Sequence, residues 1–218
     1  MFKVISRELK ALMKNYKGVG GLVVVLCAIF TPVINGGSVF AFFTLFGGVG
    51  GIAITEIESR DKAYYSILSA PCTRTDYVYG KFVSNISWLL ILAVGGWLLN
   101  MVIEMVLPGR ITPLTLGMAK IVVGYILIFI SIYHVLYFTL GVKWAKIGYF
   151  LCFFAIIFGV MMMDEVVFGA EAPKLATNIY DFLQSGALIN NLIYFVILGG
   201  VVGLFAYISA IVYDRKDL

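Results

Sequence analysis

Long apolar runs, separated by short polar segments, make up most of this chain. A helix needs roughly 20 residues to cross a bilayer, and most of the runs reach that length. The six runs are residues 18–34, 38–55, 82–106, 117–140, 147–167 and 189–212. The first two are short and joined by the turn-forming sequence TPVINGGS, which leaves open whether this hairpin crosses the membrane completely. The pattern predicts an all-α polytopic membrane protein with six transmembrane helices.

Two segments outside these runs have the period of an amphipathic helix. Residues 1–17 place apolar side chains every three or four positions, with five basic residues over the remaining surface. Such a helix lies in the membrane interface, its basic side toward anionic headgroups; an ordinary basic tail is the alternative. In residues 164–188, Pro173 suits the first turn of a helix, and apolar positions on one face follow it. This segment predicts a short external helix that dips into the outer leaflet.

The composition agrees with a membrane protein. Hydrophobic residues make up 61% of the chain and charged residues 13%, and the mean hydropathy is +1.00, whereas soluble domains are nearer half apolar and a quarter charged. We expect the 218 residues to form a single transmembrane domain. The net charge of +4 is too small to indicate nucleic-acid binding. Three cysteines, an odd number with two of them inside apolar runs, imply no disulfide framework.

The lysines and arginines are divided unevenly between the two sides of the membrane. If the N-terminus is cytosolic, thirteen of the 16 lie on the cytosolic side. They occur in residues 1–17, in the loop 56–81, in the short link between the fourth and fifth runs, and in the C-terminal tail. An excess of basic residues marks the cytosolic side of a membrane protein. We therefore expect both termini and the loop 56–81 to be cytosolic.

Motifs for catalysis, metal binding and nucleotide binding are not found in the sequence. The glycines of residues 47–51 lie in an apolar run with no lysine after them, so they form no P-loop, and we expect the chain not to be an enzyme. His134 has no carboxylate or cysteine nearby in the sequence; since a metal site needs several ligands, a packing or hydrogen-bonding role is favoured. Glu104 and Lys120 either pair across adjacent helices or extend to the interface. No array of carboxylates supports a secondary carrier.

Two GxxxG sequences lie inside apolar runs, Gly47 and Gly51 in the second and Gly199 and Gly203 in the sixth. Small residues at this spacing let two helices approach closely. Both positions are therefore candidates for helix packing.

Aromatic and methionine-rich stretches in the second and fifth runs are candidates to line a substrate pathway. Such surfaces adapt to varied apolar ligands, although the same residues also suit lipid-facing or packed positions. The candidate pathway residues are Phe42, Phe43, Phe46, Phe153, Phe154, Phe158 and Met161.

The loop 56–81 is the longest charged interruption between apolar runs. Its first part, residues 56–69, continues the preceding helix and has one apolar side. Pro71 disfavours helix at the residue before it, and Thr73 followed by Asp76 is similar to a capping box that starts the next helix. A helix, a kink and a second helix beneath the membrane suit the docking of a cytosolic partner, whose movement reaches two spans at once.

The same loop resembles a known family. Its string Glu58-x3-Lys62-x5-Leu68-x2-Pro71-x-Thr73-Arg74-x3-Val78-x2-Lys81 looks like the E…K…LLS-LP-[ST]R…V…K stretch of ABC-2-type permeases, the membrane subunits of bacterial ATP-binding-cassette exporters. Ala70-Pro71-Cys72 stands where Leu-Pro-[Val/Ile] is commoner. The resemblance extends to the layout of the whole chain.

The resemblance implies a set of partners and a location. In that family two permease copies pair, each on a separate ATP-binding subunit that holds ATP and Mg²⁺, so this chain needs no cofactor of its own. The loop between the second and third spans acts as a coupling helix, and the second and fifth spans border the pathway, in the bacterial cytoplasmic membrane. The implied coupling residues are Glu58, Lys62, Tyr65, Pro71, Thr73 and Arg74.

We therefore expect the permease subunit of an ATP-driven exporter with a hydrophobic or amphipathic substrate. The substrate is a toxin or antimicrobial peptide, as in the phenol-soluble-modulin exporters, or a drug; lipid substrates are an alternative. A non-transporting membrane scaffold or immunity protein is a rival hypothesis, and it requires no ATPase.

Overall fold

The computed structural model describes residues 10, 38–60, 73–111, 113–148, 150–151 and 174–215. Its regular elements within these ranges are helices: α3 (Val39–Arg60), α5 (Arg74–Val106), α6 (Leu116–Leu140), α8 (Lys174–Gln184) and α9 (Leu188–Asp214). The predicted helix at residues 1–17, the first predicted span, most of the fifth span and residues 61–72 lie outside the described residues.

Three helices of the described chain, α5, α6 and α9, are long and apolar enough to cross a membrane. They coincide with the third, fourth and sixth predicted spans. α3 coincides with the second, but its apolar part, Val39–Ala53, is shorter. The helical fold class is thus confirmed for the described residues, and the count of six spans stays a prediction.

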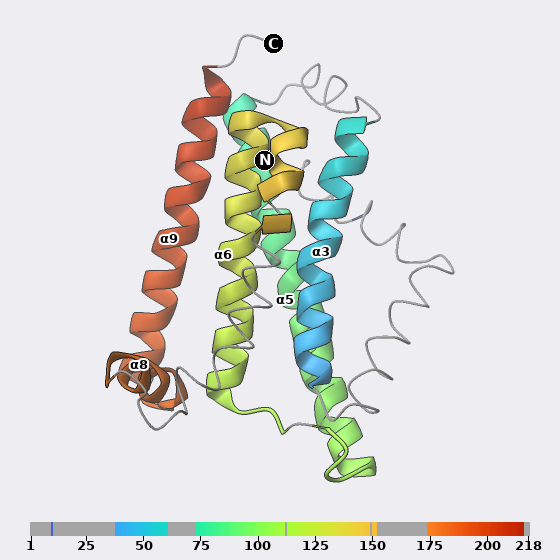
Figure 1. Ribbon diagram of the computed structural model, residues 1–218, viewed down its shortest axis with the longest axis vertical. Coiled ribbons are helices and arrows are strands. Elements are labelled where there is room, and N and C mark those ends of the chain that lie inside the picture. Colours follow the sequence, from blue (N-terminus) through green and yellow to red (C-terminus); the bar gives the residue numbers. More distant parts are fainter. Residues whose placement is uncertain are drawn as a thin grey trace.

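The helices stand side by side, and one of them crosses behind the others (Figure 1). α5 begins beside α6 and α9 at the upper end of this view and reaches α3 at the lower end. The lower end also carries α8, beside the start of α9, and the turn from α5 to α6. In the text below, the upper end is where α5 begins and α6 and α9 finish, and the lower end is the opposite one.

Glycines bring α3 directly against its neighbours. A Cβ placed on Gly47 would lie 3.2 Å from the Leu89 backbone of α5, and one on Gly51 would lie 2.5 Å from the Asn85 side chain. A Cβ on Gly48 would lie 2.5 Å from Ile126 of α6. Close approach needs residues without side chains at these positions, so the packing role predicted for the first GxxxG sequence is confirmed.

The start of α3 is capped from α5. Asn100 is buried, and its Oδ1 accepts hydrogen bonds from the backbone N–H of Val39 at 3.1 Å and of Phe40 at 3.5 Å. The first N–H groups of a helix have no partner inside the helix, and here a side chain 61 residues away in the sequence supplies one. The cap fixes the beginning of α3 at one point along α5.

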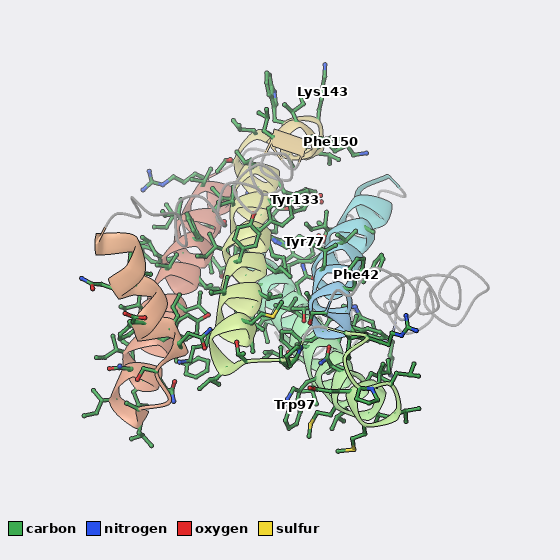
Figure 2. The ribbon with its side chains drawn as sticks, turned by 60° about the horizontal axis from the view of Figure 1, so that its bottom comes forward. Phe42, Tyr77, Trp97, Tyr133, Lys143 and Phe150 are labelled. Carbon is green, nitrogen blue, oxygen red and sulfur yellow. The ribbon has the colours of Figure 1, made fainter. Side chains whose placement is uncertain are left out.

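α6 ends at a glycine turn. Gly141 adopts φ +90°, a conformation that favours glycine, and its N–H donates to the Tyr137 carbonyl at 3.1 Å. Residues 142–148 are helical again after this turn. Ala145 is fully buried there, whereas Lys143 is exposed and projects away from the bundle (Figure 2).

Candidate functional site

The start of α5 is built as the sequence predicts. Thr73 is the N-cap: its Oγ1 accepts from the Asp76 N–H at 3.1 Å, and the Asp76 carboxylate accepts from the Thr73 N–H at 3.4 Å. This reciprocal arrangement is a capping box, which confirms the interpretation of the Thr73–Asp76 spacing. The cap begins a helix of 33 residues, so a displacement applied at Thr73 acts on the whole length of α5.

Arg74, the first residue of α5, contacts the end of α9. Its Nη1 donates a hydrogen bond to the Asp214 carbonyl at 3.3 Å. Asp214 is the last residue of α9, and the final carbonyls of a helix carry partial negative charge, which favours a cation. Two segments 140 positions apart in the sequence thus meet at the upper end.

One turn further along α5, aromatic side chains join three helices. Tyr77 of α5 is 2% exposed, and its ring lies 6.0 Å from those of Phe138 on α6 and Tyr213 on α9, measured between centroids. Phe138 and Tyr213 are edge-on to each other at 5.1 Å. Figure 2 shows Tyr77 inside the bundle, beside α6. We call Arg74, Tyr77, Phe138, Tyr213 and Asp214 the three-helix junction.

Polar groups are buried next to this junction. Lys81, one turn beyond Tyr77, is fully buried, and its Nζ lies 5.8 Å from the centre of the Tyr77 ring, within the range of a cation–π contact. A further turn along α5, the Asn85 Nδ2 lies 2.8 Å from the His134 Nε2 of α6, and the His134 Nδ1 lies 2.8 Å from the Ile130 carbonyl. This geometry places the ring proton on Nδ1, because the carbonyl only accepts and Asn85 then donates to Nε2.

His134 therefore has the hydrogen-bonding role that the sequence favoured. Its side chain is fully buried and joins α6 to α5 next to Gly51 of α3. Buried polar groups in a membrane protein hold helices together when their hydrogen bonds are made, so this contact fixes the crossing of α3, α5 and α6.

A second polar contact lies at the lower end. Lys120 of α6 is 6% exposed, and its Nζ donates to the carbonyls of Leu183 and Ser185, both at 2.9 Å. These carbonyls belong to the last turn of α8 and the residue after it, where a cation is favoured. The hydrogen-bond partners of Lys120 that the structure describes are thus carbonyls of the α8 end and not Glu104, and the side chain is buried against them.

The start of α9 is fastened to the same turn of α6. The Tyr194 hydroxyl donates to the Lys120 carbonyl at 2.6 Å. Gly124 leaves room for this contact, because a Cβ there would overlap the Tyr194 hydroxyl, and Gly117 leaves room for Gln184 of α8, which would lie 2.5 Å from a Cβ. We call Lys120, Tyr194 and the two carbonyls of the α8 end the lower clamp.

The implied coupling residues divide into three groups. Thr73 and Arg74 lie together at the start of α5. Glu58, in the first part of the loop 56–81, lies in the last turn of α3. Lys62, Tyr65 and Pro71 lie outside the described residues.

The candidate pathway residues that the structure describes lie on α3. Phe43 is 8% exposed and belongs to an apolar cluster with Val39 and Ile111, against which Phe42 and Phe46 pack partly buried. Figure 2 shows Phe42 on α3. Within a single copy these rings contribute to the core between α3 and α5, which is the alternative that the sequence left open. Phe153, Phe154, Phe158 and Met161 lie outside the described residues, and the pathway assignment stays a prediction.

Three contacts were not predicted: the Asn100 cap, the lower clamp and the bond from Arg74 to Asp214. An asparagine inside an apolar run and a lysine near the start of another are visible in the sequence as polar residues that need partners. The sequence contains no signal for the partners themselves, because in each case they are backbone groups more than 60 positions away.

Comparison with known proteins gives one match. A family model described as ABC-2 family transporter protein matches residues 3–213, nearly the whole chain. Searches of the curated proteins and of the solved structures return no significant match. The membrane proteins of this family work with an ATP-binding subunit, and the apolar helices of the described chain agree with a multi-pass membrane protein. The chain therefore belongs to the ABC-2 family of transporter proteins.

Proposed function

We propose that this chain is the permease subunit of an ATP-driven exporter and that a separate subunit hydrolyses the ATP. The family match over residues 3–213 carries the proposal. Two copies of the chain form the transporter, in the bacterial cytoplasmic membrane, with both termini in the cytosol. ATP and Mg²⁺ bind to the partner ATPase, and the permease itself holds no cofactor.

The upper end of the bundle is the cytosolic end in this proposal. Basic residues lie at this end of the described chain: Arg74 begins α5, Lys143 and Lys146 follow the end of α6, and Arg215 follows α9. Basic residues are enriched on the cytosolic side, which supports this orientation. α8 then lies on the external side, where the sequence predicts a short helix that dips into the outer leaflet.

The loop between α3 and α5 receives the ATPase. The surface consists of Glu58, Lys62, Tyr65, Pro71, Thr73 and Arg74. Its two described ends support the role, because α3 runs continuously to Arg60 and α5 starts at a capping box. Helices that enter the membrane without a break carry a displacement from the loop into the bundle.

Co-purification tests the ATPase partnership. The tagged chain, taken from its native membrane in mild detergent, should bring down a cassette-type ATPase in about equal amount. Lys62→Glu and Arg74→Glu should weaken this association, and Lys62→Glu is the cleaner variant because Arg74 also contacts Asp214. Arg110→Glu makes the same charge change at an exposed residue of the lower end and should have no effect. A chain that purifies alone would favour the scaffold or immunity hypothesis.

The substrate class is hydrophobic or amphipathic, with an amphipathic peptide toxin or antimicrobial peptide as the first candidate. In this proposal the apolar pathway forms where two copies meet, and Phe42, Phe43 and Phe46 of α3 border it. Within one copy these rings pack in the core against α5, so the support for the substrate class is the aromatic and methionine-rich sequence of the second and fifth spans. Inside-out vesicles that contain the permease and its ATPase should accumulate such a peptide when ATP is added. Vesicles that hydrolyse ATP but flip a labelled phospholipid and exclude the peptide would assign lipid substrates instead.

A further inference from the structure

We infer that α9 transmits a displacement of the loop 56–81 from the three-helix junction, at one end of α9, to the external helix α8 at the other. The inference rests on the proposed function and extends it, because the loop would act on α3 and α5, the helices it connects, and also on a helix 140 positions away. Three features of the described residues support it: the contact at the upper end of α9, the contact at its lower end, and the packing between them.

At the upper end, α9 is fastened to the first two turns of α5. Arg74 donates to the Asp214 carbonyl at 3.3 Å, and Tyr77 packs against Tyr213. Closely packed aromatic rings transmit displacement because a protein core compresses little. A movement of the α5 start therefore moves the end of α9 with it.

At the lower end, α9 is fastened to α8. Three residues connect the two helices, Ser185, Gly186 and Ala187. The lower clamp holds both sides of this connection, since Tyr194 of α9 donates to the Lys120 carbonyl while the Lys120 Nζ donates to the carbonyls at the end of α8. α8 therefore follows the start of α9.

Between its two ends, α9 is one continuous helix that packs along α6. Its 27 residues span about 40 Å. Leu198, Val202, Ala206 and Ala210 are all buried and recur every four positions, which is the spacing of a ridge that fits a groove of the neighbouring helix. An unbroken helix with this support moves as a rod rather than bending.

The displacement reaches a helix with an exposed face. On α8, Asn178, Ile179 and Asp181 are exposed. The consequence is that ATP binding at the cytosolic end changes the position of α8 at the external end, where the substrate leaves the protein.

Site-specific fluorophores test the inference in the complete complex. A polarity-sensitive bimane label is attached at Asp181→Cys on α8 or at Met105→Cys at the end of α5, both exposed, with the native cysteines Cys27, Cys72 and Cys152 replaced by alanine. The complex of permease and co-purified ATPase, in lipid nanodiscs, is compared without nucleotide and after trapping with ATP and vanadate. Trapping should shift the emission of both labels.

Two variants should separate the movement of α8 from the movement of α5. Tyr213→Leu, which removes a ring of the three-helix junction, should abolish the shift at Asp181→Cys and leave the shift at Met105→Cys. Lys120→Met, which removes the hydrogen bonds from the lower clamp to the end of α8, should do the same. Arg215→Gln is the matched control for Tyr213→Leu, because Arg215 lies two residues away and is exposed; it should leave both shifts intact. If Tyr213→Leu does not fold, Phe138→Leu tests the same junction, because it removes a ring that packs against both Tyr77 and Tyr213.

The outcomes distinguish the inference from the proposed function. If trapping still shifts the emission of the Asp181→Cys label in both variants, the α9 route is overturned. It is also overturned if, without these substitutions, the complex hydrolyses ATP and trapping shifts the emission of the Met105→Cys label but not that of the Asp181→Cys label. Failure of any ATPase to co-purify would instead overturn the proposed function, and the inference with it.

Discussion

Gly47 and Gly51 of α3 lie directly against α5, whereas a Cβ on Gly199 or Gly203 of α9 would meet no described atom within 4 Å. The two pairs have the same spacing in the sequence, yet only the first forms a close helix contact in the described chain. α9 packs on α6 through a neighbouring ridge of larger residues instead, which includes Leu198 and Val202. A small-residue motif permits close approach, but the partner helix decides whether the approach occurs. On α5 that partner surface is formed by Asn85 and Leu89.

The contrast extends to how each helix is held. α3 contacts α5 along its length, from the Asn100 cap to Asn85. α9 has its polar and aromatic contacts at its two ends, the three-helix junction and the lower clamp. We therefore expect substitutions in the α3 glycines to affect the whole fold and those at the ends of α9 to act locally.

The largest effect is expected from Gly51→Val. The new side chain would overlap Asn85, whose Oδ1 lies 2.5 Å from the place that a Cβ would occupy, and would separate Asn85 from His134. Overpacking of this kind lowers the free energy of unfolding by about 3 kcal/mol. Thermal unfolding in detergent measures it, with Gly203→Val as the matched control on α9. An equal loss in the two variants would remove the contrast between the motifs.

Lys120→Met should have the next largest effect, confined to the lower end. It removes two hydrogen bonds from a charged group to the carbonyls of Leu183 and Ser185, worth about 2 kcal/mol. Hydrogen exchange should become faster at the Ser185 amide, which donates to the Asp181 carbonyl, and stay unchanged in α3. Lys143→Met, at an exposed lysine, is the control. Faster exchange throughout the chain would contradict a local role.

Asn85→Ala should have a smaller effect. It removes the hydrogen bond to His134, and such bonds between membrane helices contribute about 0.6 kcal/mol on average. A double-mutant cycle with His134→Ala isolates this contribution from the loss of packing. Strictly additive effects of the two substitutions would show that the bond does not hold α5 to α6.

The smallest effect, with the opposite sign, is expected from Gly203→Ala. The new methyl group would meet no described atom, and alanine is favoured over glycine inside a helix by about 0.5–1 kcal/mol. The variant should therefore unfold at a slightly higher temperature than the wild type. Destabilisation would mean that another surface covers this face of α9 in the assembled transporter.

The features that the sequence predicted are local ones. The Thr73–Asp76 capping box joins residues three positions apart, and the Gly47–Gly51 motif is recognised from its spacing on one helix, although the same spacing at Gly199 and Gly203 makes no close contact in the described chain. The helical fold class and the positions of α3, α5, α6 and α9 follow from runs of apolar residues, whose length alone separates them from the loops.

The sequence does not predict which distant groups form hydrogen bonds with one another. Asn100, Lys120 and Arg74 were visible as polar residues, but their partners are backbone atoms that any residue carries. Sequence patterns distinguish side chains and not carbonyl or amide groups, so contacts to the backbone appear only in the folded chain. His134 differs, because its partner Asn85 is a side chain. The two residues lie on different helices, and the sequence pattern of one helix does not show which residue of another helix it will meet.

The Asn100 cap also limits how α3 and α5 can move. Sliding α3 along α5 by one helical turn, about 5.4 Å, would take the N–H groups of Val39 and Phe40 away from the Asn100 Oδ1, with which they bond at 3.1 and 3.5 Å. Buried N–H groups without a partner are strongly unfavourable in an apolar interior. Asn100 therefore opposes sliding of α3 along α5. A force on the loop between these two helices must tilt or translate them together, as one body.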